Sequence, residues 1–451
     1  MKWLLTLLTV IIFGTGMAQI VFIPDANFKD ALVNSNCVDL DGDEIGDVDA
    51  DTNNDGEIQV TEAEAVLALV VPLKGITSLQ GLESFVNLTL LNCQSNQVTS
   101  LDLTPNLALI KLDCRDNDLT SLIVNQNQDI EWLSCETNQL NSLDVSQNTN
   151  LIVLDCSENS LNSIDVTQNT SLCSFHCSAN QLTTIDISNN PNLLNFSCRS
   201  NSLTSLDVSQ NTDLQYLICY TNELSQLDVT NNPFLEHIKC YNNPLTSLDL
   251  SENHVLNYLW SSNSQLTNLD VSNNSLLSYL YVWQNDLTEL DLSQNPELFA
   301  IGVHQNNLSS LDLRNGNNGG IFLMWAQENP DLGCINIDNE NATYPKCMMP
   351  PFKPPAGWCK DEFTIFSENC LLGTKEFTNT LYQLYPNPVT DVFYIKSSVS
   401  IENLKVFSLQ GALRLESNAG NRMEVSDLQS GLYLVQITSE EGIFTQKFIK
   451  R

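Results

Sequence analysis

An acidic segment near the start of the chain has the residue spacing of a loop that binds a hard cation. Residues 51–62 fit the pattern D-x-[DN]-x-[DN]-G-x5-E, in which closely spaced oxygens surround one ion. A calcium ion takes roughly six to eight oxygen ligands, and Gly56 would permit the sharp turn of such a loop. The sequence thus predicts a structural calcium site, with a solvated acidic linker as the alternative. The expected ligands are the side chains of Asp51, Asn53 and Asp55, the carbonyl of Glu57 and the bidentate carboxylate of Glu62.

The region around this loop should form an N-terminal cap, residues 19–68. A helix is expected after the loop, over residues 61–69, but none directly before it, so the loop resembles the half-hand calcium loops of dockerin-like segments. Further upstream, residues 23–32 should form a short helix with Asp25 as its N-cap. We expect the calcium ion to clamp this cap onto the rest of the chain. A second, less regular cation site could form from Asp39, Asp41, Asp43 and Asp47.

Eight cysteines recur at one position of a 21-residue repeat and raise the question of metal or redox chemistry. Zinc ligands must converge on a tetrahedron, whereas these sulfurs would lie in a line, one per coil, at the spacing of neighbouring strands. A buried cysteine packs as a small hydrophobic residue. We therefore expect a reduced ladder in the core, with occasional bridges between neighbours as the alternative. The position is occupied by Cys93, Cys114, Cys135, Cys156, Cys177, Cys198, Cys219, Cys240, Ser261, Val282 and Val303.

The repeat that carries these cysteines runs from Asn87 to Leu313 and reads L-x-x-L-x-C-x-x-N-x-L-x-x-L-D-V-S-x-N-x-x. A fixed period of roughly 20 to 29 residues with this placement of Leu and Asn is the leucine-rich repeat signature. The predicted fold is mainly β: a leucine-rich repeat solenoid of stacked coils, with a parallel sheet on its concave side and little helix. The array resembles the cysteine-ladder repeats of internalin-type bacterial adhesins, and this resemblance implies adhesion or partner binding.

Two polar columns should accompany the apolar core. An asparagine three residues after each cysteine is expected to form a buried ladder that satisfies backbone groups at the turn, with Ser264 as its one break. An aspartate on the opposite arm of each coil could collect cations, but we expect it to cap the following Ser/Thr turn. The asparagines are Asn96, Asn117, Asn138, Asn159, Asn180, Asn201, Asn222, Asn243, Asn285 and Asn306, and the aspartates are Asp102, Asp144, Asp165, Asp186, Asp207, Asp228, Asp249, Asp270, Asp291 and Asp312.

The outward side chains of the concave sheet follow from the period of two in a strand. They are polar mixtures in the early coils and mostly aromatic in the later ones. Exposed Tyr and Trp suit hot spots for protein ligands, and sugar faces could stack on the same rings. The alternative is that these rings only stabilise the sheet. The predicted ligand-binding surface, which Trp325 could extend, comprises Tyr216, Tyr220, His237, Lys239, Tyr241, Tyr258, Trp260, Tyr279, Tyr281 and Trp283.

Composition and the N-terminus indicate an exported protein. The net charge is −35, from 19 Lys and Arg against 54 Asp and Glu, and it makes nucleic acid and anionic membranes poor partners. Residues 1–18 contain a short apolar run followed by small residues, which predicts a secretory signal peptide. Because no run of roughly 18 or more apolar residues is present, we expect no transmembrane segment.

Four cysteines lie beyond the ladder, where a C-terminal cap should close the hydrophobic column. In an exported chain they are disulfide candidates, although three connectivities are possible. The repeats would span residues 69–338, the cap residues 339–370 and a linker residues 371–384. Cys37 and Cys173 have no evident partner. We favour the pairs Cys334 with Cys370 and Cys347 with Cys359.

The last part of the chain, residues 385–451, has strand-like runs separated by turns and predicts a small β-sandwich. It resembles the C-terminal sorting domain of the type IX secretion system in its Y-P-N-P opening, its V-F-S-L-Q-G and L-x-x-G-L-Y-L-V segments, and its basic end. The resemblance implies a bacterium of the Bacteroidota type, recognition by the secretion machinery, and a secreted or cell-surface location. The matching residues are Tyr385, Pro386, Asn387, Pro388, Gly411 and Gly431.

The sequence therefore predicts an exported leucine-rich repeat protein that binds a protein or glycan on its concave face. A structural component of the cell surface without a specific ligand is the alternative. An enzyme is the least favoured class, because no catalytic motif surrounds any of the four histidines. His237 and Cys240, for example, are three residues apart in one predicted strand and must face opposite sides of the sheet.

Overall fold

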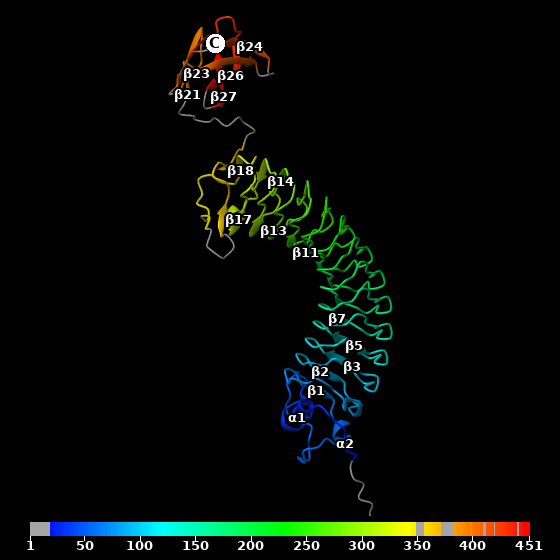
Figure 1. Ribbon diagram of the computed structural model, residues 1–451. Helices are drawn as coiled ribbons and strands as arrows, with labels where there is room; N and C mark the ends of the chain where they lie inside the picture. The colour runs from blue at the N-terminus through cyan, green and yellow to red at the C-terminus, as the bar shows by residue number, and fades with distance from the viewer. Residues whose placement is uncertain are drawn as a thin grey trace, which may run out of the picture. The chain divides into compact units, whose positions relative to one another are not determined.

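The computed structural model describes residues 19–348, 356–370, 382–397, 399–408, 412–418, 420–439 and 442–451. The chain divides into two compact units, one ending at Asn369 and the other beginning at Cys370. Figure 1 shows the first unit as a curved stack of coils, coloured from blue to yellow. The predicted signal peptide and the predicted linker up to residue 381 lie outside the described residues.

The N-terminal cap closes the first coil with two short helices. The helix α1 (Ala26–Asn34) is capped by the carboxylate of Asp25, which accepts hydrogen bonds from two amides of the first turn, so the predicted N-cap is confirmed. The helix α2 (Val60–Ala63) is shorter than the predicted helix over residues 61–69. That prediction was wrong because the chain enters the solenoid's sheet at once, as strand β1 (Ala68–Val70).

Fourteen strands of the described chain form one parallel sheet on the concave side. Neighbouring strands pair without a shift, so residues one repeat apart lie side by side, and the central residue of each strand points into the core. The strands are, in order, β1, β2 (Leu90–Asn92), β4 (Lys111–Asp113), β6 (Trp132–Ser134), β7 (Val153–Asp155), β8 (Ser174–His176), β9 (Asn195–Ser197), β10 (Tyr216–Ile218), β11 (His237–Lys239), β12 (Tyr258–Trp260), β13 (Tyr279–Tyr281), β15 (Ala300–Gly302), β17 (Leu323–Trp325) and β19 (Gly357–Cys359).

The opposite side of the coils is less regular. Within the described part of the array the helical segments are the 3-10 turns η1 (Leu82–Ser84) and η2 (Asn318–Gly320), so the prediction of little helix is confirmed. Strands on this side lie toward the two ends of the array. β3 (Ser100–Asp102) pairs with β5 (Ser121–Ile123), and a four-stranded sheet contains β14 (Glu289–Asp291), β16 (Ser310–Asp312), β18 (Cys334–Asn336) and β20 (Ile365–Ser367).

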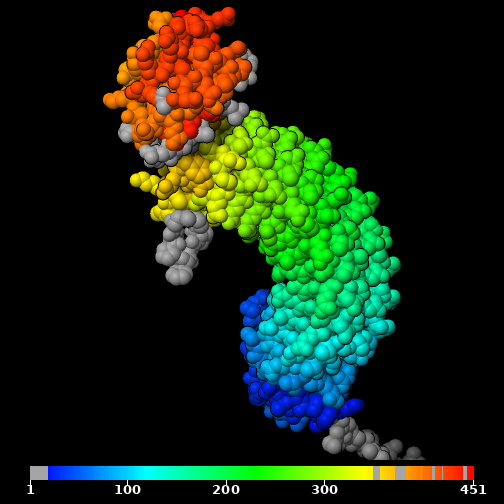
Figure 2. All heavy atoms as spheres, turned by 45° about the horizontal axis from the view of Figure 1, so that its top comes forward, coloured from blue at the N-terminus to red at the C-terminus, as the bar shows by residue number. Residues whose placement is uncertain are grey.

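A continuous hydrophobic column fills the coils, and Figure 2 shows them packed into an arc that is hollowed on its concave side. The ladder cysteines are buried and free, in agreement with the predicted reduced ladder. Burial raises the pKa of Cys93 and of Cys198 to about 12, because a thiolate would lose its hydration there. These thiols therefore stay protonated and act as packing groups.

The predicted asparagine ladder joins successive coils. Asn222, for example, donates through Nδ2 to the carbonyls of Cys198 and Cys219, both at 3.0 Å. Its Oδ1 accepts a hydrogen bond from the amide of Leu203, also at 3.0 Å. Each ladder residue thus satisfies three backbone groups that the turn buries.

A second asparagine ladder uses the last residue of the D-V-S-x-N segment, and the sequence analysis did not single it out. Asn211 is fully buried and donates through Nδ2 to the carbonyls of Ile187 at 3.0 Å and Asn190 at 2.9 Å. The ladder binds the turns of neighbouring coils together on the side away from the concave sheet. Its members are Asn106, Asn127, Asn148, Asn169, Asn190, Asn211, Asn232, Asn253, Asn274 and Asn295.

The aspartate column caps turns, as predicted. Asp228 Oδ1 accepts hydrogen bonds from the hydroxyl of Thr230 at 2.7 Å and from its amide at 3.0 Å. These bonds lower the pKa of Asp228, the hydroxyl contributing most. The hydrogen bonds account for the column without a bound cation.

Residues 339–348 and 356–369 extend the array by one more pair of strands and do not form only a cap. Strand β19 extends the concave sheet beyond β17, and β20 extends the opposite sheet beyond β18. The sequence analysis missed this extension because residues 357–359 lack the Leu spacing of the repeat. One favoured disulfide is confirmed, because Cys347 is joined to Cys359, and Cys334 and Cys370 are each disulfide-bonded as well.

The second unit is a sandwich of two antiparallel sheets around its own core. Its first strand begins at Tyr382, before the predicted boundary at Tyr385, because the buried Tyr382 pairs with the next strand and its hydroxyl lies 2.6 Å from Ser439 Oγ. Gly411 of the predicted sorting motif lies outside the described residues. One sheet contains β21 (Tyr382–Tyr385), β22 (Val392–Ser397) and β25 (Arg422–Glu424), and the other β24 (Leu413–Ser417), β23 (Ile401–Ser408), β26 (Gly431–Ser439) and β27 (Gly442–Lys450).

Candidate ligand-binding surface

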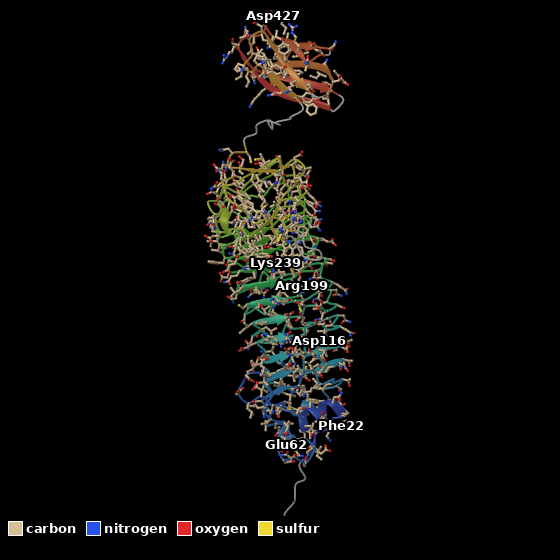
Figure 3. All side chains as sticks on the ribbon, turned by 90° about the vertical axis from the view of Figure 1, so that its left-hand side faces the viewer. Phe22, Glu62, Asp116, Arg199, Lys239 and Asp427 are labelled. Carbon is tan, nitrogen blue, oxygen red and sulfur yellow. A yellow bond between two sulfur atoms is a disulfide. The ribbon has the colours of Figure 1, made fainter. Side chains whose placement is uncertain are left out.

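The predicted ligand-binding residues lie together on the concave face, as the period of two requires. Figure 3 looks toward this side of the first unit and shows Lys239 on it. Every member is partly exposed. We call this set the aromatic surface: Tyr216, His237, Tyr258 and Tyr279 open four successive strands, Lys239, Trp260 and Tyr281 end three of them, and Tyr220, Tyr241 and Trp283 follow two residues after a strand end.

The rings of the aromatic surface stack on one another along the solenoid. The centroids of Tyr220 and Tyr241 lie 4.2 Å apart with ring planes 11° apart, and those of Tyr241 and Trp260 lie 4.3 Å apart. His237 and Tyr258 are parallel within 2° at 5.5 Å. Such pairs contribute about 0.5–1.5 kcal/mol each beyond the area they bury, so the surface is held in shape before any ligand arrives.

Further aromatic rings extend this surface toward the C-terminal end of the array. Phe299 lies 5.8 Å from Tyr279 and stacks on Phe322 at 5.6 Å. The sequence analysis missed both phenylalanines because they precede their strands, outside the alternating positions that it considered. The 21-residue period gives no signal for Phe299, because the same position holds Glu236, Asn257 and Ser278 in the preceding coils.

A second extension runs from Trp283 through His304 to Trp325, with centroid distances of 5.3 and 5.9 Å. Gly302 permits it: a Cβ at this residue would lie 3.0 Å from Cδ1 of Tyr281 and 3.3 Å from Cδ1 of Trp283. A glycine in the middle of the sheet therefore lets the neighbouring rings close over the strand. Trp325 was expected to extend the surface, and His304 was not.

Burial among the rings changes the proton affinities of the aromatic surface. Desolvation, with a smaller contribution from Lys239, lowers the pKa of His237, and desolvation also lowers that of His304. Desolvation and the neighbouring hydroxyls raise the pKa of Tyr258 to about 12. At neutral pH the two imidazoles are therefore uncharged, and Lys239, whose amine lies 5.2 Å from the centre of the Tyr258 ring, is the cation of the surface.

The other half of the concave face is more polar, and the N-terminal cap covers its beginning. Glu44 forms an ion pair with Lys111, whose amine also lies 4.5 Å from the centre of the Trp132 ring. Asn92 and Asp113, which the period of two predicts as outward, are buried in this region. The first coils are therefore a less accessible part of the concave face than the aromatic surface.

One group of side chains in this half has the residue types of a hydrolase. Ser174 Oγ lies 3.3 Å from Nε2 of His176, and Nδ1 of His176 lies 3.5 Å from Oδ2 of Asp155. Acyl transfer also needs free hydrogen-bond donors for the developing oxyanion. The backbone amides beside Ser174 are used in the sheet: its own amide donates to Ile152 at 3.1 Å, and that of Cys177 to Ser197 at 2.9 Å. These two amides are therefore not available to a developing oxyanion.

A hollow of about 500 Å3 adjoins the aromatic surface on the side where the chain enters the strands. Glu236 and Glu297 supply its acidic groups, and Val255 and Leu276 its apolar wall. Within the described chain neither carboxylate has a salt bridge, although the Tyr216 hydroxyl donates to Glu236 at 3.4 Å. The remaining lining residues are His237, Asn257 and Ser278.

The predicted calcium loop is folded tightly around its own carboxylates. Asp51 accepts hydrogen bonds from the amides of Asp55 at 3.2 Å and Gly56 at 2.8 Å, and Gly56 has the positive φ of 84° that the turn needs. Glu62 accepts from the Thr52 hydroxyl at 2.7 Å and from the Gln59 amide at 3.0 Å. The Glu57 side chain points away from the loop, to Lys29 at 2.6 Å, which suits the prediction that its carbonyl is the ligand.

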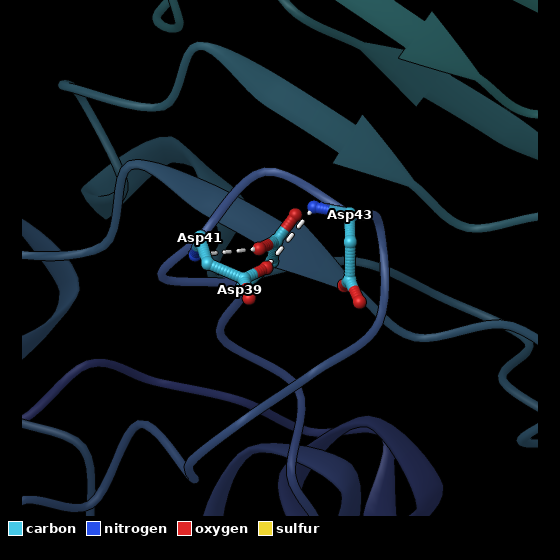
Figure 4. Close-up of side chains that lie close together, drawn as sticks. All are labelled: Asp39, Asp41 and Asp43. Carbon is cyan, nitrogen blue, oxygen red and sulfur yellow. Dashed lines mark hydrogen bonds between the residues drawn. The ribbon is translucent and has the colours of Figure 1, made fainter.

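Three of the four aspartates of the suggested second site converge. Oxygens of Asp39, Asp41 and Asp43 lie within 4.8 Å of one another (Figure 4). Asp39 is buried and accepts hydrogen bonds from the amides of Gly42 and Glu44, at 2.7 and 2.9 Å. Asp47 instead accepts from the Leu40 amide at 2.9 Å.

Comparison with solved structures shows a leucine-rich repeat fold. The functional domain of InlJ from Listeria monocytogenes, which includes a cysteine ladder, is 25% identical over 88% of this chain and 93% of that one, with a TM-score of 0.49. The internalin InlF of the same organism is 21% identical over 71% and 92%, with a TM-score of 0.57. A leucine-rich repeat protein of Leptospira interrogans is 24% identical over 57% and 74%, with a TM-score of 0.52. No curated protein matches the chain.

Residues 383–451 match the family described as the secretion system C-terminal sorting domain. The second unit is therefore a sorting domain, and the protein is a leucine-rich repeat protein exported by the type IX system to the cell surface or the extracellular space. Among the helices that the structure describes, none has the length and apolar character needed to cross a membrane.

Proposed function

We propose that this exported protein is a binding protein or adhesin that holds a protein or glycan on its aromatic surface. The observation that carries the proposal is the continuous set of partly exposed, mutually stacked rings across β10 to β13. Large rigid side chains bury much area on binding and lose little conformational entropy, which makes them effective hot spots. The stacking supports this role because the rings need not be ordered when the ligand arrives.

The test is binding of the purified chain to arrays of glycans and of surface and extracellular proteins. The variant Tyr258→Ala/Trp260→Ala/Tyr281→Ala should lose the ligands that the native chain retains. Phe22→Ala is the control, because Phe22 is an exposed aromatic residue of the N-terminal cap, away from the aromatic surface (Figure 3). Retention of the same ligands by the triple variant would remove the aromatic surface as the site.

We also propose that the loop of residues 51–62 binds one structural calcium ion. Asp51, Asn53, Asp55 and Glu62 would supply side-chain oxygens and Glu57 its carbonyl, a donor set that suits a hard cation. The tight turn at Gly56 supports the proposal, because it folds the loop back so that the amides of Asp55 and Gly56 donate to the Asp51 carboxylate. The ion would fix the cap on the first coil and would do no chemistry.

A further inference from the structure

The faces of the rings in the aromatic surface are largely covered by neighbouring rings, and this limits what the surface can bind. Tyr241 is stacked between Tyr220 and Trp260, and Tyr258 lies between His237 and Tyr279. Sugars bind aromatic side chains through an open ring face, whereas a ligand here meets mainly ring edges, which carry partial positive charge. Such edges favour hydrogen-bond acceptors such as the carbonyl groups of a peptide backbone.

The hollow beside the aromatic surface is acidic and suits a positively charged group. Glu236 and Glu297 line it without a salt bridge in the described part of the chain, and the protein carries a net charge of −35. A field of this sign speeds the approach of a basic partner and slows that of an acidic one. Glu236 immediately precedes the strand β11 and Lys239 ends it, so the charge of the surface differs between the two ends of this strand.

We propose, on the basis of the function proposed above, that the ligand is an extended segment of a basic protein, with Lys or Arg side chains in the hollow formed by Glu236 and Glu297. The backbone of the segment lies against the ring edges. Three strand spacings separate the coils that carry the two glutamates, which is roughly 14 Å. An extended peptide advances about 3.3 Å per residue, so basic side chains four residues apart match this distance.

Phage display tests the proposal: 15-residue peptides that bind the full chain are selected from a library. A glycan array is run in parallel. The expected peptides carry two Lys or Arg about four residues apart. Their affinity should fall about tenfold in Glu236→Gln/Glu297→Gln and weaken as salt rises, since both effects remove charge attraction. Glu131→Gln is the matched control, because Glu131 precedes β6 as Glu236 precedes β11.

The outcomes separate this inference from the function on which it rests. Peptides or glycans that lose binding to the triple aromatic variant but bind Glu236→Gln/Glu297→Gln normally would overturn the basic-segment proposal and leave the aromatic surface as the site. Selection of peptides without basic residues would overturn it equally. If no peptide and no glycan distinguishes the native chain from the triple aromatic variant, both proposals fail.

Discussion

Ser264 is the one natural break in the first asparagine ladder, and repairing it should stabilise the solenoid. Its hydroxyl makes a single long hydrogen bond, 3.4 Å to the carbonyl of Ser262. The amide of Leu245, which the ladder would otherwise satisfy, donates at 2.9 Å to Asn243 two residues before it. A hollow of about 280 Å3 lies at the same place, so an asparagine side chain has room.

The size of the effect follows from the regular coils. By the spacing seen at Asn222, an asparagine in Ser264→Asn would donate to the carbonyls of Cys240 and Ser261 and accept from the amide of Leu245. Three such bonds at about 0.5–1.5 kcal/mol each, less the bond that Leu245 gives up, predict a gain of about 1–3 kcal/mol. The reverse change, Asn222→Ser, should cost a similar amount.

Guanidinium unfolding followed by tryptophan fluorescence measures this change, because Trp260 lies in the coil that contains the break and Trp283 lies in the next coil. Hydrogen exchange at Leu245 should slow in Ser264→Asn and stay unchanged in Ser264→Ala, which adds no amide. An unchanged or lower midpoint for Ser264→Asn, together with a destabilised Asn222→Ser, would show that the break is compensated by contacts that our reasoning omits.

Three further results are expected. Alkylation of the folded chain at pH 8 should modify Cys173 and spare the ladder thiols, because burial raises the pKa of these thiols. If mass spectrometry shows modified ladder cysteines before the chain unfolds, the ladder is not buried as described. Burial lowers the pKa of His237 and of His304 in the folded chain. The stability that the two neutral imidazoles contribute should therefore be fully present above the unfolded pKa near 6.5 and should decline as the pH falls through the lower folded pKa values. A melting temperature that does not change over this pH range would refute this expectation. Calcium should raise the melting temperature of the native chain but not that of Asp51→Ala/Glu62→Gln, and equal shifts would exclude the loop.

The regular part of the fold could be predicted because each coil repeats the same local physics. A fixed period places the apolar residues inward and one asparagine at each turn, and only stacked coils can bury them. The second asparagine ladder was overlooked because an asparagine in a D-V-S-x-N turn also suits a solvated loop. The helix expected over residues 61–69 failed because pairing with β2 outweighs local helical preference once Leu69 enters the core.

The part of the aromatic surface that lies on the strands could be predicted from the sequence, but the residues at its margins could not. Alternation along each strand identifies Tyr258, Trp260 and Tyr281 as outward. It says nothing of Phe299, which precedes its strand, or of the hollow, which side chains from four coils form together. The extension formed by residues 339–348 and 356–369 likewise has no repeat pattern, and its place follows from the disulfide and the strand pairing.

Hydroxyl-radical footprinting of the chain with and without a ligand retained from the arrays tests the central claim most directly, because Tyr and Trp side chains react readily and report their own exposure. The account predicts that the ligand protects Tyr258, Trp260 and Tyr281 and leaves Phe22 of the N-terminal cap as reactive as before. Protection of Phe22, or of the polar first coils alone, with the three rings still fully reactive, would contradict it.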